Sequence, residues 1–501
     1  MWCLSGKESV KMNPRRFGWV GMTWLVLPVL LVLVVGSHVQ GETVPTKKWT
    51  MRYDGPLHQD SFSYEYSTLL LALFPFVEPS FKLMAVDANG DMYITGTTIT
   101  EKLYDIVTIK INKADGSIAW KTIYDGGHSY SEYPAGIALD KDGDVYVTGV
   151  TGTENVTSDI VTIKYNGTKG NIVWDQTYAG DSDFLDGATG IAVDSQKNVY
   201  VCGFTGYTDK IMNTKIPRFD YLTLKYNGSG VFQWAKTYNG PDNLWDVATA
   251  ITIGPGKNVY VTGASLSVKT QVDIATIKYS PGGKKVWAKI YDGPGHTFDV
   301  GRAIAVNASG NTYVTGESSI DGIQALVTMK YDDVATNNLP LWAKHYKDPK
   351  GNSFSWGRAL ELDVNGAPHA TGDLQGSAGI DYLTIKYSPG TGKQTWAKTY
   401  NGPATDGNDQ VRSIALDSVG NVYVTGSSMG SAGNDDIATV KYAAANGAKC
   451  WVVRYDNKPA MDYDGGVAVA VYGDKTVYVA GESTGKSTDL DMVVIRYNQA
   501  P

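Results

Sequence analysis

Three arginines occupy equivalent positions in the second half of the chain and have the chemistry of an anion site. Arg302, Arg358 and Arg412 each stand two residues before an apolar residue of a short β-branched segment. A guanidinium group pairs with carboxylates and phosphates through parallel hydrogen bonds. The sequence therefore predicts a site for a carboxylate, a phosphate or an anionic sugar. The alternative is pairing within the protein, with nearby carboxylates such as Asp299 and Asp409.

Acidic residues recur at one further position, just before the same apolar segments. A pair of carboxylates could serve a glycosidase. Repetition instead favours hydrogen bonding within loops, because six copies occur, namely Glu132, Asp186, Asp246, Asp299, Asp409 and Asp464. Residues 140–144 (DKDGD) lack the spacing and the bidentate Glu of a calcium loop, and they predict a hairpin turn.

Known catalytic signatures are missing from the chain. The sequence has no nucleophile elbow, HExxH, Walker loop or dinucleotide fingerprint. His58, His128 and His296 stand in equivalent loops of units that are not all adjacent, so a shared metal is not expected. We therefore predict no catalytic residue, no metal ligand and no cofactor, although propeller enzymes can assemble a site from scattered loops.

The elements that would position these residues come from an internal repeat. Eight hairpin signals such as GIALDKDGDVYVTG (136–149) end at glycines 53 to 60 residues apart. Two alternating apolar runs around a Gly/Asn/Asp turn predict two antiparallel strands. A third strand follows each hairpin, as in DIVTIKYN (159–166), and then a turn and a fourth strand that carries tryptophan, as in QTWAKTYNG (394–402).

Four short strands per unit without helices predict an all-β protein with a single β-propeller of four-stranded blades. The last unit stops at Tyr497 without a fourth strand, whereas KKWTMRYDG (47–55) supplies one at the other end. We therefore predict eight blades, with residues 47–54 completing the last blade. A propeller of seven blades is the alternative.

The repeat AVD-x-x-GNVYVTG, then DIxTIKY, then a turn and Trp, resembles the bacterial SBBP family of β-propeller repeats, over residues 47–501. The family name implies seven blades, and the count of eight departs from it. This resemblance implies a secreted propeller and supplies no catalytic motif. The segments 165–174 and 387–396 are more weakly similar to the tryptophan-docking repeats of eight-bladed quinoprotein dehydrogenases. That likeness would imply a quinone cofactor with calcium, but the adjacent cysteines of that site are missing here.

The repeat also separates scaffold from site, because one ligand cannot occupy eight equivalent places. The tryptophans of the fourth strands are expected to pack between blades, with sugar stacking as the alternative. The cation of each third strand is expected to pair between blades or to lie over an aromatic ring. Any function should lie in residues that break the repeat.

Two insertions break the repeat in length. Residues 61–81 (SFSYEYSTLLLALFPFVEPSF) are apolar and could be a lid, a partner patch or a loop packed on its own propeller. Residues 207–219 carry Lys210, Lys215 and Arg218 and are expected to form a solvated loop. Both insertions should lie at the same mouth of the channel.

The N-terminus predicts export. Residues 17–36 carry no charge and follow Arg15 and Arg16, and residues 39–41 suit a signal peptidase. We predict a signal peptide over residues 1–41, with a possible start at Met12, and the propeller over 42–501. An uncleaved anchor is the alternative.

Composition sets the remaining expectations. The formal net charge is −7, which does not suggest nucleic-acid binding. We expect a secreted, periplasmic or cell-surface monomer with no stable membrane span after cleavage. It would be a non-enzymatic binding or surface-interaction scaffold whose partner is a protein, a glycan or a small anion. The alternative is an exported propeller enzyme, quinone-dependent or polysaccharide-active, with its site at the channel mouth.

Overall fold

The computed structural model describes residues 42–499, except for 57–59, 62–69, 71–73, 75–80, 102, 128–129, 153–156, 181–183, 212–213, 334–338, 352, 377–378, 405, 458–462 and 486–489. The predicted signal peptide at residues 1–41 lies outside this range. Within it, no helix is long and apolar enough to cross a membrane.

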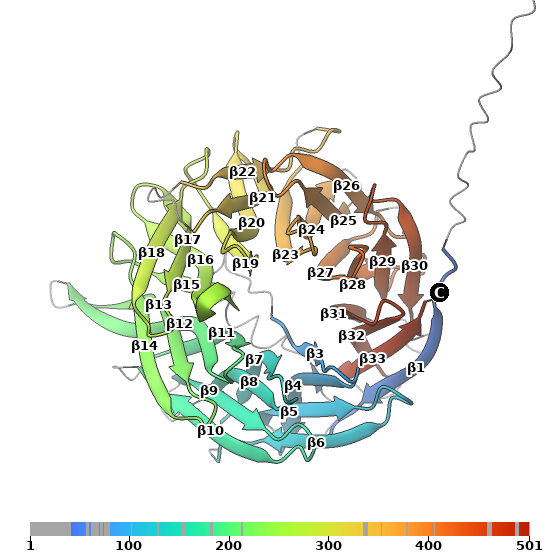
Figure 1. Ribbon diagram of the computed structural model, residues 1–501, viewed down its shortest axis with the longest axis horizontal. Coiled ribbons are helices and arrows are strands. Elements are labelled where there is room, and N and C mark those ends of the chain that lie inside the picture. The colour runs from blue at the N-terminus through green and yellow to red at the C-terminus, as the bar shows by residue number, and fades with distance from the viewer. Residues whose placement is uncertain are drawn as a thin grey trace, which may run out of the picture. The chain divides into compact units, whose positions relative to one another are not determined.

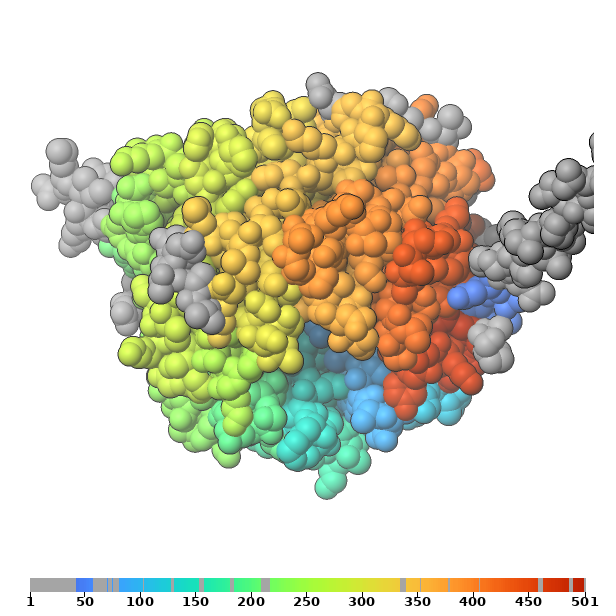
Figure 2. Space-filling model, turned by 45° about the horizontal axis from the view of Figure 1, so that its top comes forward, coloured from blue at the N-terminus to red at the C-terminus, as the bar shows by residue number. Residues whose placement is uncertain are grey.

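The described residues from 42 to 499 form eight antiparallel sheets arranged around a central axis, as Figure 1 shows, and Figure 2 shows the same ring in a tilted view. The innermost strands are β3 (Met84–Val86), β7 (Glu132–Leu139), β11 (Asp186–Val193), β15 (Asp246–Ile253), β19 (Val300–Val306), β23 (Ser355–Leu362), β27 (Asp409–Leu416) and β31 (Asp464–Tyr472). Each begins one blade, and the blades are numbered first to eighth in this order.

The second strands follow hairpin turns, and they are β4 (Met92–Thr100), β8 (Val145–Gly152), β12 (Val199–Ile211), β16 (Val259–Ser267), β20 (Thr312–Ile320), β24 (Pro368–Gly376), β28 (Val422–Met429) and β32 (Thr476–Thr484). The third strands are β5 (Leu103–Ile111), β9 (Ser158–Tyr165), β13 (Thr214–Tyr226), β17 (Gln271–Tyr279), β21 (Ile323–Tyr331), β25 (Gly379–Tyr387), β29 (Asp435–Tyr442) and β33 (Leu490–Asn498).

The outermost strands are β6 (Ile118–Tyr124), β10 (Ile172–Tyr178), β14 (Phe232–Tyr238), β18 (Lys285–Tyr291), β22 (Trp342–His345), β26 (Gln394–Tyr400), β30 (Lys449–Tyr455) and β1 (Thr46–Tyr53). A short strand β2 (Asp60–Ser61) pairs with β4, and η1 (Pro255–Lys257) lies in a hairpin turn. The turn at residues 140–144 is a hairpin turn as predicted, because the Asp140 amide donates to the Asp144 carbonyl.

Strand β1 completes the eighth blade, in the order β1-β33-β32-β31, and so closes the ring. It pairs with β33 from Thr46↔Asn498 to Tyr53↔Met492. The prediction of eight blades closed by residues 47–54 is confirmed, and the alternative of seven blades is excluded. Closure removes the exposed sheet edge that a terminal blade would otherwise present.

The hydrophobic core lies between neighbouring blades. One cluster joins Tyr93 and Ile106 of the first blade to Ile137 and Val147 of the second. Another joins Trp396 of the sixth blade to residues of the seventh, among them Val424. Each sheet is apolar on both faces because each face is covered by an adjacent sheet, which is the reason one blade cannot fold by itself.

The tryptophans of the outer strands are scaffold, as expected. The Trp120 indole donates to the Gly167 carbonyl of the next blade at 3.1 Å. The corresponding indoles of Trp49, Trp174, Trp234 and Trp396 also donate to carbonyls of the following blade. The expectation for the third-strand cations holds as well, since Lys110 lies 5.1 Å from the Tyr93 ring centroid and 3.3 Å from Asp91.

Candidate functional site

One face of the ring carries the two insertions and lies next to the arginine positions. The antiparallel order places on this face the start of each innermost and third strand and the end of each second and outer strand. We call it the mouth face. The links between second and third strands, and the links between blades, are both on it.

The arginines predicted to bind an anion occupy a repeated bulge near this face. The innermost strands of seven blades each contain a register shift at the same position relative to the second strand. The residues within these shifts are Ala135, Thr189, Thr249, Arg302, Arg358, Arg412 and Val467. A bulge redirects its side chain away from the ladder.

Where the bulged residue is threonine, its hydroxyl donates a hydrogen bond to the innermost strand of the next blade. The Thr189 hydroxyl donates to the Ala248 carbonyl of the next innermost strand at 2.7 Å. The Thr249 hydroxyl donates to Gly301, one blade further on, at 2.6 Å. The repeated role of the bulge is therefore contact between blades near the axis.

Arginine changes this role in three consecutive blades. Arg302 is 5% exposed and forms an ion pair with Glu317 of its own blade. Arg358 pairs with Asp373 at 2.9 Å, and Asp373 in turn accepts a hydrogen bond from the Val411 amide of the next blade at 3.0 Å. Arg302 and Arg358 thus pair within the protein, but their partners are Glu317 and Asp373 rather than Asp299 and Asp409.

Arg412 differs from the other two. Its side chain is exposed, and it donates a long hydrogen bond of 3.5 Å to Gln410. The residue that corresponds to Glu317 and Asp373, directly after the closing glycine of the second strand, is Ser427. The exposure of the guanidinium groups therefore increases along the arc from Arg302 to Arg412.

The apolar insertion packs on this same face. In the part of it that the structure describes, Leu70 and Phe74 are each 1% exposed. The Phe74 ring lies 5.1 Å from Phe204 and 5.0 Å from Phe219, between centroids. For these two residues, the contacts bear out the alternative of a loop packed on its own propeller. Phe204 and Phe219 belong to β12 and β13, so both insertions lie at one mouth, as predicted.

The insertion at residues 207–219 was predicted to be a loop, and this prediction was wrong. Strands β12 and β13 continue through it as a paired hairpin, from Tyr207↔Arg218 to Ile211↔Thr214. Alternation of apolar and polar residues is weak there, which is why the extra strand length could not be read from the sequence.

The repeated carboxylates at the links between blades mostly accept hydrogen bonds from the backbone, as expected. Asp246 accepts from the Gly240 amide at 2.7 Å, and Asp409 accepts from Gly402 at 2.6 Å. Burial raises the pKa of Asp186, Asp246, Asp299 and Asp464, each to about 6. These carboxylates accept hydrogen bonds from the loops between blades and thereby fix the conformation of those loops.

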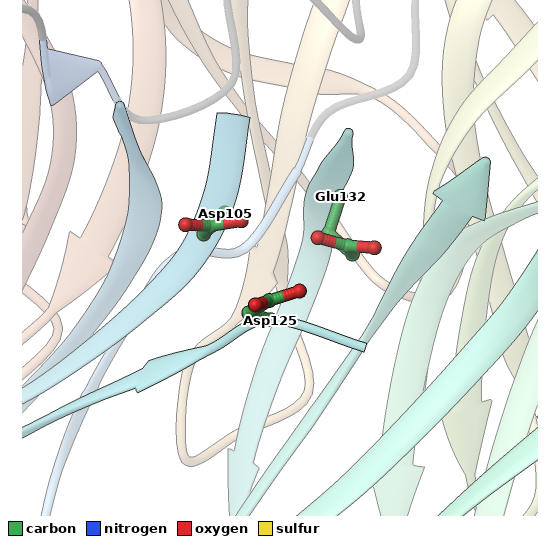
Figure 3. A group of neighbouring side chains, drawn as sticks. All are labelled: Asp105, Asp125 and Glu132. Carbon is green, nitrogen blue, oxygen red and sulfur yellow. The ribbon is translucent and has the colours of Figure 1, made fainter. Parts of the chain in front are cut away.

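Sequence reasoning missed that, among the residues described, three links each gather three carboxylates. The groups are Asp105, Asp125 and Glu132; Asp273, Asp292 and Asp299; and Asp436, Asp456 and Asp464. Within each group one oxygen per residue lies within 4.8 Å of the others. The signal was present as an Asp opening the third strand together with a Tyr-Asp pair ending the outer strand. Figure 3 shows the first group, in which the three carboxylates converge from β5, the end of β6 and β7.

The cysteines do not fit a quinoprotein site. Cys202 is buried in β12 and Cys450 is partly buried in β30, and both are free thiols in different blades. The described part of the chain therefore contains no adjacent cysteine pair.

Comparison with known proteins agrees with the fold. Residues 121–155 and 398–431 match the SBBP family, described as Beta-propeller repeat. No curated protein matches the sequence.

Three solved structures resemble the chain at low sequence identity. A quinohemoprotein alcohol dehydrogenase from Pseudomonas putida is 13% identical, with 91% of this chain and 78% of that chain covered and a TM-score of 0.46. A periplasmic gluconolactonase from Pseudomonas aeruginosa is 13% identical, with 73% and 98% covered and a TM-score of 0.43. The polysaccharide lyase Uly1 is 14% identical, with 75% and 93% covered and a TM-score of 0.43. Similarity at this level carries no information on activity.

Proposed function

We propose that this β-propeller repeat protein is an exported, non-enzymatic binding module that takes an anionic group at the mouth face, beside Arg412. The observation that carries the proposal is the break in the repeated bulge. Four blades place a neutral residue there, and three consecutive blades place arginine. A structural role that recurs around the ring would not require arginine in only three of the blades.

The charges along the arc indicate where a ligand would bind. Glu317 and Asp373 already neutralise Arg302 and Arg358, so these two arginines chiefly shape the surface. Arg412 is the exposed one of the three arginines. A carboxylate, phosphate or acidic sugar would therefore reach the Arg412 guanidinium first and make its main charged contact there.

Two features favour binding over catalysis. Glu317 and Asp373, the two carboxylates beside the arginines, are each held in an ion pair with arginine, which does not suit a pair of general acid and base. The repeated carboxylates instead organise loops. Export is proposed from the uncharged N-terminal segment that follows Arg15 and Arg16.

The test measures citrate and sulfate binding by calorimetry and by soaking crystals. We expect an anion against the Arg412 guanidinium, and loss of binding in Arg412→Ala. Lys393→Ala, an exposed cation in a turn on the opposite face, is the matched control and should bind normally. Equal binding by wild type and Arg412→Ala would overturn the proposed site.

The enzyme alternative has separate readouts. A quinone-dependent protein would show cofactor absorbance or calcium-dependent reconstitution with the quinone. A polysaccharide-active enzyme would release reducing or unsaturated ends from an acidic polysaccharide. Either result would replace the binding module by a catalyst at the same mouth.

A further inference from the structure

The first carboxylate group lies where the first and second blades meet. Asp105 is the third residue of β5, Asp125 directly follows β6, and Glu132 begins β7. Asp105 and Glu132 are 2% and 0% exposed, whereas Asp125 is exposed at the surface. The group is therefore a buried pair of carboxylates with one carboxylate open to solvent.

Little in the protein balances this charge. Asp105 accepts a hydrogen bond from Thr100, and Glu132 Oε1 accepts one from Thr151 at 3.0 Å. Among the residues described, no lysine, arginine or histidine forms an ion pair with any of the three carboxylates. Ionised carboxylates that are buried together without a cation are costly.

One buried oxygen in the group lacks a hydrogen bond. It is Glu132 Oε2, and Figure 3 shows the Glu132 carboxylate beside those of Asp105 and Asp125. Buried polar atoms in native proteins are nearly always paired, so a buried carboxylate with an unpaired oxygen beside two more carboxylates indicates a missing cation.

Two other links between blades show how this protein satisfies the same position. At the seventh blade, Arg454 of β30 lies 2.8 Å from Asp436, the counterpart of Asp105. At the eighth blade, Arg52 of β1 pairs with Asp491. The residue of β6 at the position of Arg454 and Arg52, directly before the last tyrosine of the strand, is Ile123. The link between the first and second blades thus has the three carboxylates but no arginine at this position of its outer strand.

We propose that Asp105, Asp125 and Glu132 bind a hard divalent cation, with Ca²⁺ as the best fit. All the donors are oxygens, which calcium prefers and which give softer metals no nitrogen or sulfur ligand. Oxygens within 4.8 Å of one another can share one ion at calcium distances of about 2.3–2.6 Å. Water would complete the coordination on the exposed side of Asp125. The ion would join the first two blades, as Arg454 joins its strand to Asp436.

The second group is a weaker candidate, because His296 Nδ1 already lies 2.7 Å from Asp292 Oδ2. In the third group, Asp436 already pairs with Arg454. These differences make the first group the one that the arrangement favours, and they supply controls within the same chain.

The experiment uses the full chain after dialysis against a chelator, and it measures bound calcium and thermal unfolding. We expect added Ca²⁺ to raise the melting temperature, and Mg²⁺ to do so less. Asp125→Asn should bind one calcium ion fewer than wild type and lose most of the thermal response. Asp456→Asn, the exposed counterpart at the link that holds Arg454, should bind as wild type does.

A second variant tests the same idea without removing an acid. Ile123→Arg places at the first link the cation that β30 and β1 already carry. We expect it to bind one calcium ion fewer and to melt at the same temperature with and without calcium. If Asp125→Asn and Ile123→Arg both bind as much calcium as wild type, or if wild type binds none, the site does not exist.

Discussion

The indole of Trp120 lies flat against the backbone of Gly170 in the neighbouring blade. A Cβ placed on Gly170 would come within 2.5 Å of the Trp120 ring, and the φ of Gly170 is 75°. The same contact joins Trp49 to Gly116, Trp174 to Gly230, Trp342 to Gly392 and Trp396 to Gly447. The interface between blades thus pairs a tryptophan on one blade with a glycine, which has no side chain, on the next.

This contact predicts that Gly170→Ala is strongly destabilising. The methyl group would collide with a buried ring and would also hold an unfavourable positive φ, so we expect a loss of about 3 kcal/mol or more in the free energy of unfolding. Gly143→Ala is the matched control, since its φ is 85° but nothing lies within 4 Å of its Cβ. It should lose only about 1 kcal/mol in urea unfolding. Equal losses would show that the indole contact is unimportant.

Ring closure predicts a large effect of the N-terminal strand. Deletion of residues 42–54 removes β1 and exposes the edge of β33, together with the apolar surface that covers Met51. We expect a loss of several kcal/mol in the free energy of unfolding, and a tendency to associate through the open edge. Chemical denaturation and light scattering measure the two effects. Unchanged unfolding would contradict closure by β1.

The pair of Arg302 and Glu317 predicts an asymmetric response to substitution. Glu317→Gln leaves a buried guanidinium without its carboxylate, and we expect a loss of about 3 kcal/mol. The double variant Arg302→Thr with Glu317→Ala recreates the pair Thr249 and Ala264 of the preceding blade. It should recover most of the lost stability in thermal unfolding. A double variant less stable than Glu317→Gln would show that the pair itself is required.

Buried carboxylates predict that acidic pH stabilises the fold. Burial, and then the charge of Asp246, raises the pKa of Asp220 to about 7, whereas an unfolded Asp titrates near pH 3.9. Between these values the folded protein holds a proton that the unfolded chain has lost. Stability should therefore fall as pH rises from 5 to 8, with Asp220 contributing on the order of 1–2 kcal/mol.

Asp220→Asn isolates this contribution. Its unfolding free energy should change less between pH 5 and pH 8 than that of wild type, measured in urea at both values. The exposed Asp115→Asn is the control and should keep the wild-type slope, since hydrogen bonds from the Ser117 amide and hydroxyl lower the pKa of Asp115 and leave it ionised throughout this range. A slope in Asp220→Asn equal to that of wild type would show that Asp220 is ionised in the folded protein.

The architecture could be predicted from the sequence because the same pattern of four strands recurs eight times. Hairpin turns, β-branched third strands and tryptophan strands are local patterns, and each copy checks the others. Even the closure was readable, since a unit without its fourth strand ends the chain and KKWTMRYDG precedes the first unit. The long hairpin at 207–219 was missed because strand pairing there carries no such repeated pattern.

The candidate sites depended on contacts across blades, which no local pattern encodes. The sequence by itself determined a closed ring of eight blades. It also showed that the acidic position recurs in six units, whereas arginine occupies its own position in only three. Only the tertiary structure decided that Glu317 and Asp373 accept two of those arginines, and that Asp105, Asp125 and Glu132 meet at one point. The physical reason is that Asp105 and Asp125 belong to the first blade and Glu132 to the second. The three carboxylates therefore come together only after the two sheets have packed.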